Sequence, residues 1–412
     1  MKVLLTLLLL QHEHNAAPGT TTSLLDVSQS RTASGTAWIP DAALVPGYHA
    51  MAGDWKLMLH GSAVLQFVRV TGTRAVSQVG STNWVMLMAT RSGAANALRA
   101  RAMLTAEPYT LSGAGYPQLL QVAHPYRGTP APDRQHPHEL FAELSLAWEH
   151  ALTSGVAFSI YGAPVGEPAI GPVAYNHRPS AAYEPSAPLG HIAQDYTHES
   201  LGVVTLGVFG RRARLEGSVF NGSHPDERHA NFDLQGGKLD SYAGRLTVAA
   251  AARTTASAWF AYNAPETAAG HAHGSLHRFG AAVLHSHARP SAEGEWSTTL
   301  VYAATLPQGA SEPLHTVLLE SRFDVSHHHA VFSRVEYVRR TADELALTGS
   351  VPPEMTVGAA SLGYAWRTTV PRRFTLAAGA RITVNVVPAP LRPFYGSANP
   401  LGLLAYLRLS PP

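Results

Sequence analysis

The feature that most constrains this chain is a strict alternation of apolar and polar residues, repeated in segments of about ten residues. In 139–148 one face is apolar and the other carries Glu139 and Glu143. The apolar face comprises Leu140, Ala142, Leu144, Leu146 and Trp148. The same alternation recurs in 239–248, 317–325, 331–338 and 374–384. Successive side chains of a β-strand point to opposite faces, so the pattern predicts strands with one apolar face and one polar face.

Sixteen segments are expected to be strands. They are 55–69, 80–91, 95–106, 138–149, 154–162, 198–209, 213–221, 239–249, 254–263, 275–287, 295–305, 314–325, 330–339, 355–368, 373–386 and 400–409. Many are longer than the usual five or six residues of strands in soluble proteins. The links alternate between short turns, such as 210–212, and long loops, such as 107–137, 163–197 and 222–238.

Short turns at one end and long loops at the other are typical of outer-membrane barrels, which have an even number of strands. We therefore predict an all-β fold: a transmembrane antiparallel up-and-down β-barrel of about 16 strands (14–18), with short periplasmic turns and long extracellular loops. A soluble β protein with solvated strand faces is the alternative. The last strand keeps Leu401, Leu403 and Leu407 on one face, as the assembly signal of such barrels does.

The organisation expected along the 412 residues has three parts. Residues 1–17 are a candidate signal peptide, because "MKVLLTLLLL" joins a positive start to an apolar run. Residues 18–53 are expected to be a flexible N-terminal segment, and 54–412 the barrel. A buried N-terminal segment of a soluble protein is the alternative. The chain has no cysteine, so its stability has to come from a source other than disulfides, such as a closed strand ladder.

Composition limits the partners. The net charge is only +2 and charged residues make up 14%, so there is no concentrated basic face for nucleic acid. The location expected is the bacterial outer membrane, with membrane lipid and lipopolysaccharide around the barrel and small solutes as its ligands. The sequence leaves the oligomeric state open.

A barrel of sixteen strands is wide enough to leave a water-filled lumen. Charged residues of the inner faces are candidates for a constriction that selects solutes by charge. They are Glu139, Glu143, Glu216, Arg245, Glu320, Arg322, Arg334, Glu336 and Arg381. The function predicted first is therefore porin-like passage or binding of small solutes, with no catalytic residues.

Histidines gather in and beside the long loops and give a second hypothesis, a metal-binding barrel. Candidate loop-site residues are Asp133, Arg134, His136, His138, Glu167, His177, His191, Asp195, His198 and Asp226. His136 and His138 flank Pro137 and are the candidate metal ligands, for Cu or Zn. His271 and His273 repeat the spacing. The alternative is that these rings cap loops or hydrogen-bond carboxylates.

A third hypothesis is a lipid-modifying enzyme. His198 and Ser200 have the His-x-Ser spacing of outer-membrane phospholipase. Counting in twos from Val208 places both residues on the apolar side of their strand, as lipid chemistry requires. Serine catalysis also needs a group that orients the imidazole and an oxyanion donor, and the sequence places neither.

Five segments occur in an order that resembles a family of uncharacterised bacterial outer-membrane barrel proteins. They are "DRQHPHELF", "YGAPVGEPAIGPVA", "HRPSA", "QDYTHES" and "EGSVFNGSHPDE"; "STNWVMLMATR" also fits. The resemblance extends from about Trp55 to the last strand and implies the fold and the location, without an established activity. Relatives tend to begin with Met/His-rich segments and to occur beside copper-handling functions. Here that segment is reduced to His12, His14, His49, Met51, Met58 and His60.

Overall fold

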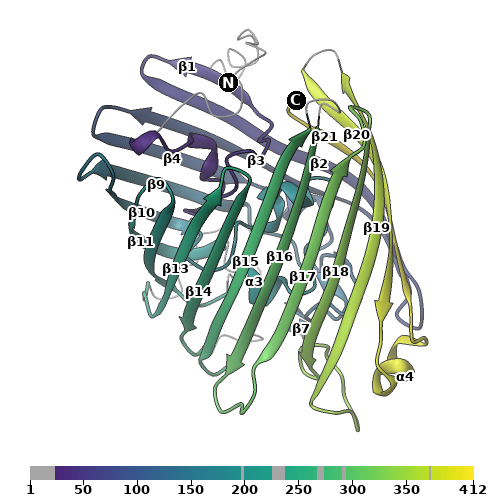
Figure 1. Ribbon diagram of the computed structural model, residues 1–412. Coiled ribbons are helices and arrows are strands. Elements are labelled where there is room, and N and C mark those ends of the chain that lie inside the picture. Colours follow the sequence, from purple (N-terminus) through teal and green to yellow (C-terminus); the bar gives the residue numbers. More distant parts are fainter. Residues whose placement is uncertain (1–23, 196–198, 225–236, 267–272, 290–293, 371–372) are drawn as a thin grey trace.

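Sixteen antiparallel strands close into a barrel in the computed structural model, which describes residues 24–195, 199–224, 237–266, 273–289, 294–370 and 373–412 (Figure 1). Closure occurs where β2 (Trp55–Val70) pairs with β3 (Val76–Ser92) on one side and with β21 (Leu401–Ser410) on the other. A further strand, β1 (Tyr48–Ala52), forms a hairpin with the first residues of β2. The predicted fold class is confirmed.

Each of the sixteen predicted strands is present. Between β3 and β21 the wall runs through β4 (Asn96–Leu104), β9 (Phe141–Ala151), β10 (Ala157–Gly166), β11 (Ser200–Phe209), β12 (Ala213–Asn221), β13 (Ser241–Ala251), β14 (Thr254–Asn263), β15 (Leu276–Arg289), β16 (Gly294–Pro307), β17 (Leu314–Asp324), β18 (His329–Thr341), β19 (Glu354–Val370) and β20 (Phe374–Val386). Every neighbouring pair is antiparallel, so the ladder satisfies the backbone as a lipid environment requires.

The links between strands and the N-terminal segment before β1 carry short elements. They are β5 (Tyr116–Pro117), β6 (Pro125–Tyr126), β7 (Thr129–Pro130), β8 (Arg134–Gln135), α2 (Glu107–Thr110), α3 (His191–Gln194), α4 (Arg392–Tyr395) and the single-turn helices η1 (Leu24–Asp26), η2 (Gln29–Arg31), η3 (Tyr175–His177), η4 (Pro179–Ala181) and η7 (Ala389–Leu391). None of the helices among the described residues is long and apolar enough to cross a membrane.

The outer face of the wall is apolar, as the alternation predicts. In β17 Val317, Leu319 and Phe323 are exposed, while Glu320 and Arg322 are buried on the inner side. The same separation holds for the predicted faces of β13, β18 and β21. Large apolar side chains exposed in rows around a closed barrel are the surface that lipid covers.

The predicted apolar face of β9 is wrong at the start of the strand. Ala142 was expected beside Leu144 and Leu146 on the lipid side, but it is buried, 3% exposed. The pairing of β4 with β9 shifts between Met103 and Leu104, where two steps along β9 oppose one step along β4. This β-bulge inserts one extra residue and directs Ala142 inward.

The N-terminal residues 24–45 lie inside the barrel, against the periplasmic half of the wall. Trp38 and Ile39 are buried, and Trp38 packs edge-on against Phe209 at a ring separation of 6.4 Å. Arg31 Nη1 donates to the carbonyl oxygen of Arg211 in the turn after β11, and Arg31 also pairs with Asp41. Part of the segment expected to be flexible is thus packed against the inner wall; the candidate signal peptide lies outside the described residues.

At Gly35 the N-terminal segment contacts Glu167, in the long loop after β10. The φ of Gly35 is +50°, and a Cβ there would lie 2.5 Å from Glu167 Cβ. Glycine alone fits this left-handed turn against a neighbour at that distance. Beside it, Ser34 Oγ donates to Glu167 Oε2 at 2.9 Å.

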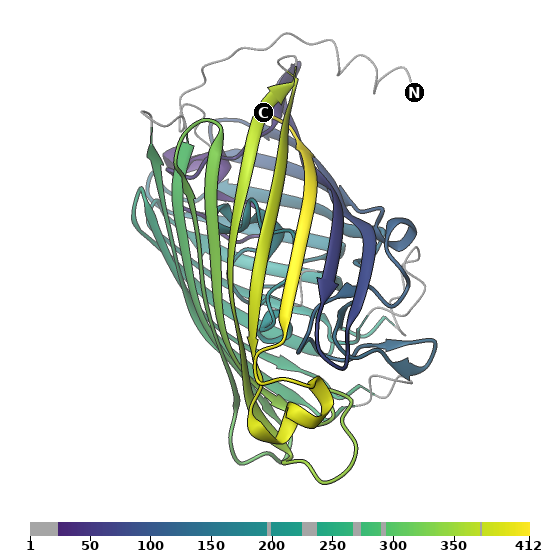
Figure 2. The ribbon, with the colours of Figure 1, turned by 90° about the vertical axis from the view of Figure 1, so that its right-hand side faces the viewer.

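The loop between β10 and β11 also folds inward. Its helices η3, η4 and α3 lie within the ring of strands in both views (Figures 1 and 2). Val173 and Ala193 of this loop join a buried cluster with Leu284 and Val301 of the opposite wall. This long loop, which the sequence places at 163–197, therefore reaches into the lumen.

The expected water-filled lumen differs from what the described residues show. Residues 24–45 and the loop 167–195 pack against the inner wall, and the charged side chains there are buried rather than hydrated. Several of these buried charges, among them Glu216 and Glu320, meet an opposite charge, which offsets much of their desolvation. Two segments of its own chain therefore occupy part of the lumen.

Candidate functional site

The charged residues predicted for a constriction lie on the inner side of the barrel. Eight of them are at most 8% exposed: Glu139, Glu143, Glu216, Arg245, Glu320, Arg322, Arg334 and Glu336. The side chain of Arg381 is 11% exposed. Apart from Glu139, whose backbone N–H donates to Glu199, they belong to two ion-pair networks that hold the inward-folded segments.

The first network binds the N-terminal segment. Arg245 pairs with Glu216 at 3.0 Å and donates to Thr36 Oγ1 at 2.9 Å and to the carbonyl oxygen of Gly171 at 3.0 Å. Arg101 pairs with Glu143 at 3.3 Å and donates to the carbonyl oxygen of Ala33. Arg245 thus joins the wall to both the N-terminal segment, at Thr36, and the loop after β10, at Gly171.

The second network binds the loop after β10. Arg178, 1% exposed, pairs with Asp195 at 3.0 Å within the loop and with Glu320 of β17 at 3.3 Å. Arg334 of β18 pairs with the same Glu320 at 2.5 Å and donates to the carbonyl oxygen of Ser186 at 2.8 Å.

Further contacts extend this second network along the loop. Arg381 pairs with Glu184, and the backbone N–H of Leu189 donates to Glu336 at 2.5 Å. Arg322 lies 4.9 Å from the ring of Tyr183, and its own partners are Asp324 and Glu295. Each of these wall residues therefore meets either the loop or another charge of the wall.

The eight predicted loop-site residues that the structure describes do not come together as one site. Asp133 and Arg134 belong to the base of the loop after β4: Asp133 pairs with Arg74 at 2.5 Å, and Arg134 donates to Gln78 at 2.8 Å. Glu167 lies under the N-terminal segment, and burial together with Glu143 raises its pKa to about 8. His198 and Asp226 lie outside the described residues.

His138 is held by a carboxylate. Its Nδ1 lies 2.7 Å from Glu107 Oε2, and its backbone N–H donates to the same oxygen at 2.9 Å. Burial lowers the pKa of His138, but Glu107, Glu199 and Asp195 together outweigh this and raise it to about 9. A ring that is protonated at neutral pH is a poor metal ligand, because the metal needs the neutral form.

Near this pair lies a second histidine–carboxylate contact, His191 Nδ1 to Asp195 Oδ1 at 2.6 Å. Burial and Glu139 raise the pKa of Glu199 to about 8, although His138 acts in the opposite direction. These groups form a buried acid–base cluster beneath the loops, which favours their structural role over the predicted metal role of His138.

His136 turns instead toward other histidines. Its ring centroid lies 4.4 Å from that of His124 and 6.4 Å from that of His138. His124 in turn lies 6.0 Å from His224, and His224 lies 5.8 Å from His273. Three extracellular loops, after β4, β12 and β14, therefore bring their imidazoles into one continuous row of rings.

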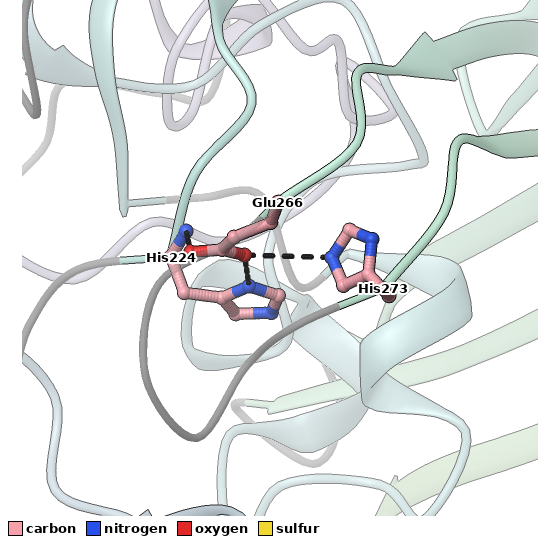
Figure 3. A group of neighbouring side chains, drawn as sticks. All are labelled: His224, Glu266 and His273. Atoms are coloured by element: carbon pink, nitrogen blue, oxygen red, sulfur yellow. Dashed lines mark hydrogen bonds and ion pairs between the residues drawn. The ribbon is translucent and has the colours of Figure 1, made fainter.

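At one end of this row of imidazoles, His224, Glu266 and His273 form a group whose ligand atoms all lie within 4.8 Å of one another (Figure 3). Glu266 lies between the rings: its Oε2 is 2.6 Å from His224 Nδ1 and 3.4 Å from His273 Nε2. The backbone N–H of His224 donates to Glu266 Oε1 at 3.1 Å, which fixes the carboxylate. A pair of backbone hydrogen bonds of 3.0 Å between Glu266 and His273 positions both residues.

The protonation of this group suits a cation. His273 Nδ1 lies 2.7 Å from the carbonyl oxygen of Gly274, and donation there leaves the lone pair of Nε2 directed at Glu266. Burial lowers the pKa of His224, opposed by its hydrogen bond and ion pair with Glu266, and so favours the neutral ring.

The sequence pattern singled out His136 and His138, whereas the structure groups His124, His224, Glu266 and His273. His273 was noted for its spacing to His271, which lies outside the described residues. Glu266 had no signal, because it is a single acidic residue in a loop and its partner His224 is 42 residues away.

Ser200 does not lie on the lipid face that the enzyme hypothesis requires. It is 7% exposed at the start of β11, where it pairs with Gly166, whereas Val204, Leu206 and Val208 further along the strand are exposed. The geometry therefore gives no support to lipid hydrolysis at this serine.

No protein-family model and no curated protein matches the sequence. Among solved structures, the chain is similar to Salmonella typhi OmpF in a complex with daunomycin, with 8% identity, a TM-score of 0.53, and coverage of 88% of this chain and 99% of that one. Others are an anion-selective porin from Comamonas acidovorans (12% identity, TM-score 0.48, coverage 86% and 99%) and the outer-membrane channel DcaP of Acinetobacter baumannii (10%, 0.48, 88% and 100%). At this identity the likeness to OmpF shows a common fold, a porin-like outer-membrane barrel.

Proposed function

We propose that this chain resides in the bacterial outer membrane and binds a divalent transition-metal ion, Zn(II) or Cu(II), at its extracellular loops. The observation that carries the proposal is the convergence of His224, Glu266 and His273 with His124 near by. Two imidazoles and one carboxylate are a known ligand set for zinc, with a fourth position left for water or another ligand.

The surroundings of the group support binding from the outside. It lies on loops at the end of the barrel opposite the short turns, and the His273 side chain is 23% exposed. His224 and Glu266 are buried, so a bound ion is partly withdrawn from water and its attraction to the carboxylate is strengthened. His124 and His136 add two imidazoles within reach of an ion that moves between loops.

Zinc titration of the refolded barrel in detergent tests the proposal. The wild type is expected to bind Zn(II), and the double variant His224→Gln/His273→Gln to bind at least tenfold more weakly, since loss of even an outer-shell partner typically weakens metal binding about 10–100-fold. The matched control is His327→Gln/His329→Gln, which changes one histidine of the periplasmic turn after β17 and the first residue of β18, and should leave this affinity unchanged.

If His224→Gln/His273→Gln and the control both bind Zn(II) with the affinity of the wild type, the proposed site is contradicted. Titration with Cu(II) under the same conditions compares the two ions. Cu(II) is expected to bind more tightly, because it exceeds Zn(II) in affinity for most nitrogen and oxygen sites. Glu266→Gln keeps the size of the side chain and removes its charge, so it separates the carboxylate's role from packing.

Passage of small solutes is a second candidate, favoured by the porin-like barrel and its charged inner wall. Passage requires that residues 24–45 or the loop 167–195 leave the lumen, since both now fill it. Liposomes that contain the refolded protein and a small sugar provide the test. Swelling faster than in protein-free liposomes supports an open route at rest, and equal swelling contradicts one.

A further inference from the structure

A second group of metal-binding side chains lies inside the barrel, on the wall formed by β2, β3 and β4. Met58 and His60 are two residues apart on β2, and Met86 and Met88 are two residues apart on β3. Alternate residues of a strand share a face, so each strand presents two of these side chains to the interior. Met103 of β4 adds another.

The register aligns these residues across the strands. Met58 is paired with Met88, His60 with Met86, and Met86 with Met103. Directly opposite residues of antiparallel strands have neighbouring side chains, so the group forms one continuous patch. Met86 is fully buried and Met103 is 4% exposed, in one cluster with Met88 and, at its edge, Met58.

The loop after β10 completes the patch from the lumen side. His177, in η3, places its Nε2 3.3 Å from Met103 Sδ, and His60 Nε2 lies 3.2 Å from Met86 Sδ. The two imidazole centroids are 5.4 Å apart. Two nitrogen–sulfur pairs thus lie next to each other, one on each side of the Met86–Met103 register pair.

We propose that His60, Met86, Met103 and His177 bind a soft monovalent cation, Cu(I) or Ag(I). Thioether sulfur selects Cu(I) over divalent ions, and imidazole is compatible with copper. Bonds of about 2.0 Å to nitrogen and about 2.3 Å to sulfur put two donors of one ion roughly 3 to 4 Å apart. Both observed nitrogen–sulfur distances fall in this range.

The surroundings favour a soft ion of low charge. One carboxylate adjoins the patch, since Glu143 is paired with Met103 across β4 and β9. Arg101 pairs with it at 3.3 Å, and Ser145 and Tyr161 donate hydrogen bonds to it, so its oxygens are already engaged and the patch itself offers sulfur and nitrogen rather than the oxygen ligands of Ca(II). The nearby charge is Arg101, which is paired with Glu143 and donates to the carbonyl oxygens of Ala33 and Gly35. That pairing limits the repulsion that Arg101 exerts on a cation.

Trp84 forms another side of the patch. Its ring centroid lies 4.5 Å from that of His177 and 5.0 Å from that of His60. The negative face of an indole attracts cations within about 6 Å. The ring also covers the imidazoles and keeps water away from them.

Packing alone does not require this composition. Leucine fills a buried position as well as methionine does, yet the patch collects Met58, Met86, Met88 and Met103 out of the chain's 7 methionines. In the ion-free protein the short contacts serve as N–H···S hydrogen bonds. When a cation binds, the ring proton moves to Nδ1, and the lone pair of Nε2 then binds the ion.

The patch continues to the periplasmic rim. On β1 His49 is paired with Met58, and Met51, two residues further on, is 65% exposed. An ion leaving the interior along this wall therefore meets sulfur and imidazole donors at successive positions. This site is separate from the extracellular group of His224, Glu266 and His273 and does not depend on it.

Titration of the refolded full chain with Ag(I) tests the proposal. We expect tight binding by the wild type and at least tenfold weaker binding by Met86→Leu/Met103→Leu, a change that keeps side-chain volume and so preserves the fold. The matched control Met355→Leu alters a buried methionine in another cluster and should leave Ag(I) affinity unchanged. Zn(II) titration of the same variants should also be unchanged, which separates this site from the extracellular one.

X-ray absorption of the silver-loaded wild type gives a readout that needs no variant. Sulfur and nitrogen neighbours together are expected around silver, and His177→Gln should reduce the nitrogen contribution. Silver surrounded by nitrogen alone, or an affinity that Met86→Leu/Met103→Leu leaves unchanged, would overturn the proposal and leave the contacts as hydrogen bonds.

Discussion

Arg178 is the residue whose replacement tests the closed barrel most sharply. Its guanidinium is fully buried and ties the loop after β10 to Glu320 of the wall and to Asp195 of the loop. Removing one partner of a buried ion pair costs about 3–5 kcal/mol, because a buried charge is left uncompensated. Glu320 retains Arg334, and Asp195 retains His191, so we expect the lower end of this range.

A loss of about 3 kcal/mol corresponds to a roughly hundredfold shift in the equilibrium between docked and released loop. Arg178→Met preserves most of the side-chain volume, and the strand ladder of the barrel does not include this loop. The variant should therefore fold but release its loop more often.

Planar-bilayer recording is the assay. Wild-type protein is expected to be silent for most of the time, and Arg178→Met to spend roughly a hundredfold more time conducting. Arg91→Met is the matched control, because Arg91 pairs with Asp54 on the exposed rim and should leave conductance unchanged. A permanently conducting wild type, or an Arg178→Met trace identical to that of Arg91→Met, would refute the closed-lumen account.

Two further predictions concern pH and lipid. The pKa of Glu167 is about 8 in the folded protein, above its usual value of 4.5, so docking of the N-terminal segment favours the protonated form. Its contribution is complete below pH 4.5 and is lost as pH rises through about 8; hydrogen-exchange protection factors of residues 33–37 should fall over this range, and Glu167→Gln should flatten the decline. Leu206→Arg places a charge on the lipid face and should destabilise the barrel by about 2–4 kcal/mol in urea unfolding from liposomes, whereas Leu152→Arg in the turn after β9 should cost about 0–1 kcal/mol.

The wall of the barrel could be predicted because its signal is local. Side chains alternate with a period of two in every strand, and lipid on one side keeps one face apolar, as in Val317, Leu319 and Phe323. The exception at Ala142 is also local, but the bulge leaves no mark in the sequence, because Leu140, Phe141 and Ala142 are all apolar and fit either face.

The filling of the lumen could not be predicted in the same way. Arg178 and Glu320 are 142 residues apart, and Arg245 and Thr36 are 209 residues apart. Each reads as an ordinary polar residue until its partner is known. Alternation therefore predicted which residues face inward, and long-range pairing decided whether they face water or protein.

The candidate metal sites follow the same division. His136 and His138 stood out because they are adjacent in sequence, yet Glu107, 31 residues away, engages His138. The contacts of His60 and His177 with Met86 and Met103 join three strands and a loop, and the sequence showed only methionines spaced by two. Spacing identifies which side chains share a face, and the fold determines which faces meet.

The most direct test of the account is anomalous diffraction from crystals of the full chain loaded with Zn(II) and, separately, with Ag(I). The account predicts a zinc peak between His224, Glu266 and His273, and a silver peak between His60, Met86, Met103 and His177. Zinc found only at the periplasmic histidines 327–329, or at no site in the extracellular loops, would contradict the proposed function. Silver absent from the inner wall of β2, β3 and β4 would contradict the second site.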